Sequence, residues 1–211
     1  MKKYLTELVG TFFLVLVIGL AGAEPISGPL AIGTILMVMV FMGGHISGAH
    51  YNPAVSLSLL FLKKIELKDT LMYIGFQVLG ATLAALVSWY LTDQTFAPAP
   101  GVEFSTMEIL VAEILFTFAL VIVILNVAAT ESPSVKGNSY YGLAIGFTVM
   151  AGAFAVGGIS GGAFNPAVGL GPILVELAGG DTGSVGALWI YLAGPITGGL
   201  LAALFFRFQE S

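Results

Sequence analysis

Apolar residues are grouped into six long stretches, separated by short segments in which glycine, proline and charged residues gather. The long stretches cover residues 4–22, 28–44, 70–92, 108–129, 139–157 and 187–206. A helix needs about 20 residues, within a range of about 17–25, to cross the ~30 Å apolar core of a bilayer. The pattern therefore predicts six membrane-spanning helices.

Two further apolar stretches, 53–62 and 166–178, are too short to cross. At about 1.5 Å per residue, each reaches roughly half of the bilayer core. Each follows a glycine-rich segment: residues 44–55 read Gly-His-Ile-Ser-Gly-Ala-His-Tyr-Asn-Pro-Ala-Val, and residues 157–168 read Gly-Gly-Ile-Ser-Gly-Gly-Ala-Phe-Asn-Pro-Ala-Val. Asparagine is a favoured N-cap and proline a favoured first helical residue. Each segment therefore predicts an irregular loop that leads into a half-length helix.

The composition supports a membrane protein and excludes several kinds of chemistry. Hydrophobic residues make up 57% of the 211 residues and charged residues only 9%, whereas a soluble domain carries about 25% charged residues. The chain has no cysteine and two histidines, so disulfides, thiol catalysis and a metal site built from histidines are excluded. No catalytic constellation, cofactor motif or basic patch for nucleic acid is present. We therefore expect no enzyme, no cofactor, no metal and no nucleic-acid partner.

The two halves of the chain are related by an internal repeat. When Asn52 is aligned with Asn165, an offset of 113 residues, 30–33 matches 143–146, both reading Leu-Ala-Ile-Gly. We interpret residues 1–211 as a single membrane channel domain with repeats over about 1–95 and 105–211. Three spans per repeat is an odd number, so the second copy enters from the opposite face and the repeat is inverted.

The first span has a second interpretation. Lys2 and Lys3, an apolar run and the small residues 21–23 imitate a secretory signal peptide with its cleavage site. Because this span is half of a matched pair, we expect it to stay in the mature protein.

The basic residues indicate the orientation. With the N-terminus inside, all of them fall on one side: Lys2, Lys3, Lys63, Lys64, Lys68, Lys136 and Arg207. The loops on the opposite side carry acidic residues and no lysine or arginine. The positive-inside rule therefore predicts an integral protein of the plasma membrane with both termini cytoplasmic.

The two half-helices enter from opposite faces and are expected to meet near the middle of the bilayer. Irregular backbone is tolerated at that depth only where it is buried in protein or lines a watery cavity. We expect six residues to turn backbone carbonyls towards a pore: Gly48, Ala49, His50, Gly161, Gly162 and Ala163. Each helix N-terminus carries about half a positive charge, so cations and protons would be repelled. The capping residues Asn52 and Asn165 would orient a neutral polar solute.

These residues resemble the major intrinsic proteins, the family of aquaporins and aquaglyceroporins. The likeness rests on the layout of six spans and two half-spans and on two boxes, Asn52-Pro53-Ala54 and Asn165-Pro166-Ala167. It implies a homotetramer in the lipid bilayer in which each protomer has its own passive pore. It also implies that Glu7 and Glu113 brace the two loops, although Glu7 taken alone could instead reach the membrane interface, and that His50 lines the pore.

The chain departs from this family at its selectivity filter. Most members have arginine after the second Asn-Pro-Ala box, where this chain has Val168. The other filter positions correspond to Ile32, Ala153 and Gly162, which together make a wide, uncharged ring. Glycerol facilitators usually have aspartate where this chain has Gly169, and an Asn-Pro-Ala-Val box resembles the plant vacuolar branch. Members of that branch pass water and, in some cases, urea, ammonia or hydrogen peroxide.

The leading hypothesis is a passive channel for water and small uncharged solutes with a wide, apolar selectivity filter. One alternative is a facilitator that prefers glycerol, urea or ammonia and conducts little water. Another is an ion-coupled secondary transporter, because inverted repeats with broken helices also describe that class. A non-conducting structural protein is a further possibility.

Overall fold

The computed structural model describes residues 1–210, and this part of the chain is helical without a strand. Among these residues, six helices are long and apolar enough to cross a membrane. They are α1 (Lys2–Ala21), α2 (Ser27–Ser47), α4 (Leu67–Thr92), α5 (Thr106–Ile124), α6 (Tyr141–Ser160) and α8 (Leu188–Gln209). Their bounds agree with the predicted stretches to within a few residues. A π-helical turn, η1 (Leu125–Ala129), extends α5, and a 3₁₀ turn, η2 (Val185–Ala187), precedes α8.

Two short helices, α3 (Pro53–Phe61) and α7 (Pro166–Ala178), begin at the predicted prolines. The Asn52 side-chain oxygen accepts a hydrogen bond from the Ala54 N–H at 2.8 Å, and Asn165 accepts from the Ala167 N–H at 2.9 Å. These bonds satisfy helix N–H groups that have no partner within the helix. The predicted fold class, an all-α polytopic membrane protein with two half-helices, is confirmed.

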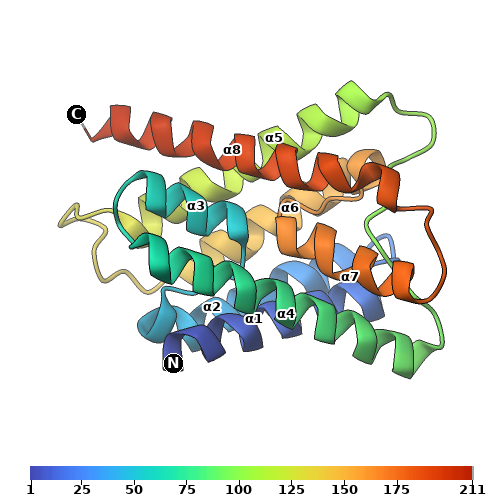
Figure 1. Ribbon diagram of the computed structural model, residues 1–211. Coiled ribbons are helices and arrows are strands. Elements are labelled where there is room, and N and C mark those ends of the chain that lie inside the picture. Colours follow the sequence, from blue (N-terminus) through green and yellow to red (C-terminus); the bar gives the residue numbers. More distant parts are fainter. Residues whose placement is uncertain (211) are drawn as a thin grey trace.

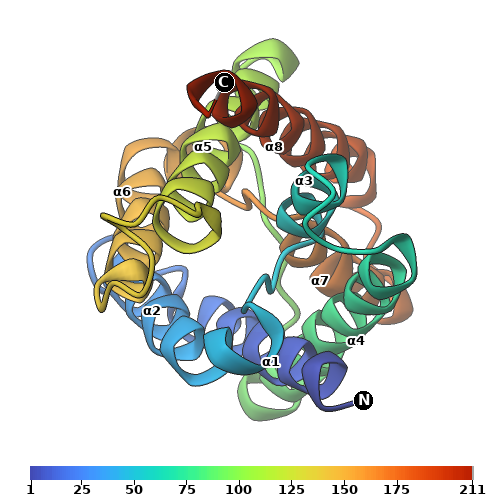
Figure 2. The same cartoon turned by 90° about the vertical axis from the view of Figure 1, so that its left-hand side faces the viewer.

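The half-helices complete the wall of the bundle. Figure 1 shows α3 and α7 in opposite halves of the molecule, each with its N-terminal end towards the other. Seen from the end that carries both termini, the long helices form a ring in which α3 and α7 lie between α4 and α8 (Figure 2). The loops that precede α3 and α7 cross inside this ring. Together the two half-helices take the place of a seventh spanning helix.

Close contacts hold α1 against α4 and α5 against α8. At Gly80 of α4, an added Cβ would lie 2.5 Å from the Leu8 carbonyl oxygen, and at Gly198 of α8 it would collide with the Ile114 carbonyl. Glycine therefore lets each pair of helices approach to backbone contact, as small residues do in membrane proteins. This tight frame fixes the positions of α1 and α5, which carry Glu7 and Glu113.

The basic residues gather at one end of the bundle, which also holds both termini (Figure 1). There, Lys3 of α1 forms an ion pair of 2.6 Å with Asp69 of α4. The Lys64 ammonium group donates to the Ala129 carbonyl at 2.8 Å, across the space between two loops. The structure thus places the basic loops on a common face, which we call the basic end.

Candidate functional site: a channel between two half-helices

A cavity of about 550 Å³ lies within the helix ring. Its lining begins at Glu24 and Phe96 near the end opposite the basic end, passes Asn52 and Asn165, and reaches Ile124 at the C-terminal end of α5. The cavity therefore follows the long axis of the bundle and passes the point where the two half-helices meet.

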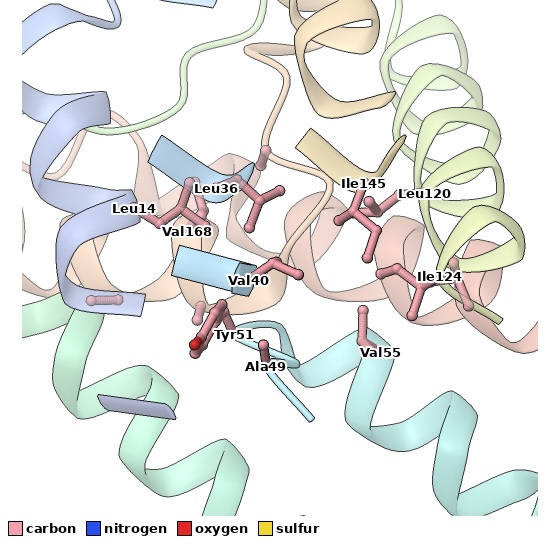
Figure 3. Packing of buried hydrophobic residues seen from close by; sticks show 14 of the residues in the cluster. Leu14, Leu36, Val40, Ala49, Tyr51, Val55, Leu120, Ile124, Ile145 and Val168 are labelled. Carbon is pink, nitrogen blue, oxygen red and sulfur yellow. The ribbon is translucent and has the colours of Figure 1, made fainter. Parts of the chain in front are cut away.

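The cavity wall is largely made of the buried apolar residues of the protein. Figure 3 shows their side chains converging from several helices. Those that line the cavity include Leu14, Leu36, Val40, Ala49, Tyr51, Val55, Leu120, Ile124, Ile145 and Val168. A wall of this kind offers little hydrogen bonding to a solute, so the few polar groups that reach the cavity decide how a polar molecule is held.

The two asparagines join the half-helices to each other. The Asn52 side-chain amide donates to the Phe164 carbonyl oxygen at 2.9 Å, and the Asn165 amide donates to the Tyr51 carbonyl oxygen at 2.9 Å. Each asparagine therefore caps its own helix with its oxygen and braces the opposite loop with its nitrogen. An amide NH₂ group carries two N–H donors, so one N–H of each asparagine is engaged in this brace and only the second is left for a solute.

Glu7 lies under the first loop and is completely buried. Its carboxylate accepts hydrogen bonds from the N–H groups of His50 at 3.0 Å and Tyr51 at 2.7 Å, and from the Ser47 hydroxyl at 2.6 Å. The Gln77 side chain donates a further bond at 2.8 Å. Glu7 therefore stays inside the protein, where it holds two consecutive backbone N–H groups of the loop in place. It does not reach the membrane interface.

Glu113 makes the equivalent contacts under the second loop and is also completely buried. It accepts from the Ser160 hydroxyl at 2.7 Å and from the N–H groups of Ala163 at 3.0 Å and Phe164 at 2.7 Å. Tyr191 then donates to the Ser160 carbonyl oxygen at 2.7 Å, as Tyr73 does to the Ser47 carbonyl oxygen at 2.7 Å. The serine and tyrosine partners were not predicted. The serines could have been recognised from the sequence, because both loops share the triplet Ile-Ser-Gly.

The first loop has a polar network that the second lacks. The His50 ring nitrogen Nδ1 lies 2.9 Å from the Ser56 hydroxyl, which also accepts from the Gln77 side chain at 3.1 Å. In the second repeat, Ala163 and Gly169 take the places of the histidine and the serine. His50 lines the cavity, so the two halves of the wall differ in hydrogen-bonding capacity.

All four residues at the expected filter positions line the same cavity: Ile32, Ala153, Gly162 and Val168. Within residues 1–210, no lysine or arginine lies on this wall. The loop after α4 also lines the cavity with Phe96 and Pro98, a contribution that the sequence pattern did not predict. This loop is tied to the end of α6, because the Gly101 N–H donates to the Ile159 carbonyl at 3.0 Å.

Five of the six residues expected to present carbonyls belong to the cavity wall: Ala49, His50, Gly161, Gly162 and Ala163. Gly48 is the exception, because it is not among the lining residues. It adopts a left-handed conformation, with φ of 86°, and its N–H closes the last turn of α2 on the Gly44 carbonyl. Gly48 therefore turns the chain away from α2. Glycine is favoured at such a helix end because it adopts the left-handed conformation freely.

A bundle of membrane-spanning helices with two facing half-helices around a central cavity has the architecture of a membrane channel. The sequence model of the major intrinsic protein family matches residues 1–206, and the chain belongs to this family. The expected family is thus confirmed, and the protein is a membrane channel rather than an enzyme.

Relatives from several kinds of organism have similar sequences. The chain is 35% identical to the putative aquaporin NIP4-1 of Arabidopsis thaliana, over 93% of this chain and 70% of the relative. It is 34% identical to the glycerol uptake facilitator protein-like 6 of Lactiplantibacillus plantarum, over 100% of this chain and 99% of the relative. The X-ray structure of the aquaglyceroporin from Plasmodium falciparum shares the fold, with a TM-score of 0.85 and 23% identity over 97% of this chain and 94% of the other.

The anchoring of the first loop gives a testable prediction about stability. Tyr51 is completely buried, and a Cβ added at Gly10 of α1 would collide with its ring. We expect Gly10→Ala to displace this ring and to lower the free energy of unfolding by about 1–3 kcal/mol, the usual cost of overpacking. Thermal unfolding in detergent measures the change. The matched control is Gly75→Ala in α4, where an added Cβ meets nothing within 4 Å. A lower unfolding temperature for both variants would contradict the proposed role of Gly10.

Proposed function

We propose that this protein is a passive channel for water and small uncharged solutes, with a wide, apolar filter formed by Ile32, Ala153, Gly162 and Val168. The observation that carries the proposal is the reciprocal brace inside an apolar cavity, in which Asn52 donates to the Phe164 carbonyl oxygen and Asn165 donates to the Tyr51 carbonyl oxygen. This brace sets two helix N-termini against each other inside the ring of long helices. In each protomer, the two inverted repeats would form one pore.

The same geometry disfavours the passage of positively charged solutes. Each of the two helix N-termini carries about half a positive charge and faces the cavity. A cation would meet this positive field after losing its water against an apolar wall, whereas a neutral solute accepts a hydrogen bond from the remaining N–H of each asparagine. Backbone carbonyls at His50 and Gly162 supply acceptors on the two sides of the centre. This arrangement supports passage of neutral molecules and exclusion of cations and protons.

Ion-coupled transport is the less favoured alternative. Coupling requires a carboxylate or polar cluster that an ion can reach. Glu7 and Glu113 are completely buried, accept several hydrogen bonds each, and do not line the cavity. They therefore act as supports for the loops. A facilitator that prefers glycerol, urea or ammonia over water is the closer alternative, because a relative that is 34% identical is named glycerol uptake facilitator protein-like 6 and the filter has no arginine.

The sidedness and assembly are also part of the proposal. The basic end would face the cytoplasm, in agreement with the positive-inside rule, and both termini would lie there in the plasma membrane. Each protomer would have its own pore within a homotetramer, as the resemblance to the family implies.

Stopped-flow light scattering on reconstituted vesicles tests the proposal, with water, glycerol, urea and ammonia compared in one preparation. We expect rapid osmotic shrinkage and solute flux that rises linearly with concentration, both well above those of protein-free vesicles. Flux that saturates at low solute concentration, or that depends on an ion gradient, would indicate a transporter. Slow shrinkage together with rapid solute flux would support the facilitator, and shrinkage and solute flux both no faster than in protein-free vesicles would support a non-conducting structural role.

Mercury sensitivity tests the position of the filter. The chain has no cysteine, so we expect mercuric chloride to leave the permeability of the natural protein unchanged. The Ala153→Cys variant places a thiol on the cavity wall, and mercury should block it. Leu143→Cys, on the exposed side of the same helix, is the control and should remain insensitive. Mercury inhibition of the natural protein, or equal inhibition of both variants, would argue against this filter position.

A further inference from the structure

A second cavity of about 550 Å³ opens at the basic end, between the C-terminal ends of α3 and α8. We call it the end pocket. Its lining combines three cations, one carboxylate and two aromatic rings: Lys63, Lys64, Arg207, Glu210, Phe61 and Phe206. It is separate from the channel cavity, with which it shares no lining residue.

Two of the three cations have no protein partner among the described residues 1–210. Lys63 and Arg207 form neither an ion pair nor a side-chain hydrogen bond there. Lys64 donates one bond to the Ala129 carbonyl oxygen, and its nitrogen lies 5.8 Å from the centre of the Phe206 ring. Glu210 accepts a bond from Thr130 at 3.1 Å. The positive charges therefore exceed the single carboxylate, and an anion that enters the pocket can reach several donors.

The backbone at Lys63 shows that this lysine occupies a position better suited to glycine. Both half-helices end in the same pair of turn hydrogen bonds, made by Lys63 and Lys64 after α3 and by Gly180 and Asp181 after α7. The first residue of each pair is left-handed, with φ of 57° at Lys63 and 90° at Gly180. Glycine adopts this conformation freely, whereas other residues do so at a cost. The turn after α7 has glycine at this position, whereas the turn after α3, at the basic end, has a strained lysine that lines the pocket.

The surface next to the end pocket is apolar and follows one face of α8. Leu204, Leu200 and Ile196 precede Arg207 by three, seven and eleven residues, which places them in a stripe along the same side of the helix as this pocket residue. Leu204 is exposed, and Leu200 and Ile196 are partly exposed. The stripe leads from the pocket towards the middle of the span, where hydrocarbon surrounds the protein. A ligand that fits both features has an anionic head and an apolar chain.

We propose that the end pocket binds the phosphate group of an anionic phospholipid, whose acyl chain lies along the exposed stripe of α8. Clusters of lysine and arginine at the cytoplasmic surface attract acidic lipids, and basic pockets between helices hold their headgroups. The competing explanation is that Lys63 and Arg207 only balance the partial negative charges at the C-terminal ends of α3 and α8. That role requires no lipid, so lipid binding separates the two explanations.

The test measures binding of phosphatidylglycerol and phosphatidylcholine to the delipidated full chain in detergent by native mass spectrometry. The Lys63→Gln/Arg207→Gln variant should bind phosphatidylglycerol about 25-fold more weakly, since each cation near an anionic lipid contributes about fivefold. The matched control, Lys2→Gln/Lys68→Gln, removes two charges from the same end but outside the pocket and should stay within about twofold of the natural protein. Phosphatidylcholine binding should be weak and equal in all three proteins.

A single substitution separates lipid binding from folding. Lys63→Gly should unfold at a higher temperature in neutral detergent, because it relieves the left-handed lysine, and should still bind phosphatidylglycerol about fivefold more weakly. The proposal is overturned if both double variants lose affinity equally or neither does, or if phosphatidylcholine binds as tightly as phosphatidylglycerol. It is also overturned if millimolar inorganic phosphate displaces the lipid completely, which would indicate a site for soluble phosphate.

Discussion

Vesicles that contain the Glu113→Leu variant are expected to shrink no faster than protein-free vesicles under osmotic shock. The substitution removes the acceptor of the Ala163 and Phe164 N–H groups and of the Ser160 hydroxyl, all buried under the second loop. Each unpaired buried group costs about 1–3 kcal/mol, so the total approaches a large part of the ~5–15 kcal/mol that stabilises a typical protein. The loop should lose its fixed path, and the brace between the half-helices should be lost with it.

The control for this prediction is Glu113→Gln, which keeps one acceptor oxygen in nearly the same volume. Its NH₂ group faces the Phe164 N–H without accepting from it, so we expect a lower unfolding temperature with part of the water permeability retained. Thermal unfolding in detergent and stopped-flow shrinkage are measured on the same preparations. If the leucine variant were as permeable as the natural protein, Glu113 would not support the loop.

The Val168→Arg variant is expected to conduct water but to lose at least about tenfold of its glycerol and urea flux, which corresponds to roughly 1.4 kcal/mol added to the barrier. Val168 is almost completely buried on the cavity wall, which also includes residues with small side chains such as Ala153 and Gly162. A guanidinium group at this position fills the space that a solute larger than water requires. It also adds five fixed N–H donors, to which water can hydrogen-bond.

Two comparisons sharpen this test. Val168→Leu adds volume without charge, so a similar loss of solute flux in both variants would assign the effect to pore diameter alone. Leu177→Arg places the same charge at an exposed position near the end of α7 that does not line the cavity, and it is not expected to reproduce the selective effect. If the ratio of water to solute flux is the same before and after Val168→Arg, Val168 does not form the constriction.

Much of the fold was accessible from the sequence because a bilayer imposes simple constraints. Helices must be long and apolar, and basic residues gather on one side, so the six spans and the common basic end followed from composition and spacing. The half-helices also followed from the sequence, since asparagine and proline mark a helix start locally. The predicted starts at Pro53 and Pro166 are those of α3 and α7.

The supports of the loops were harder to predict because their residues come from distant parts of the chain. Glu7 and Glu113 were identified through the repeat, but Gln77 and the tyrosines Tyr73 and Tyr191 were not. A polar residue in an apolar helix indicates a buried partner without saying which one. Gly48 was expected to present its carbonyl to the pore because it lies in the shared motif; it ends α2 as Gly161 ends α6, but only Gly161 is among the residues that line the cavity.

The sequence by itself determined the number of spans, the two half-helices, the family motif and the residue types at the filter, because these depend on local spacing and on the repeat. Only the tertiary structure decided that each asparagine braces the opposite loop, that Phe96 and Pro98 reach the cavity, and that Lys63 and Arg207 share a pocket. The reason is physical. A hydrogen bond or a pocket between residues more than a hundred positions apart depends on how the helices pack, and helix packing leaves no periodic signal in a single sequence.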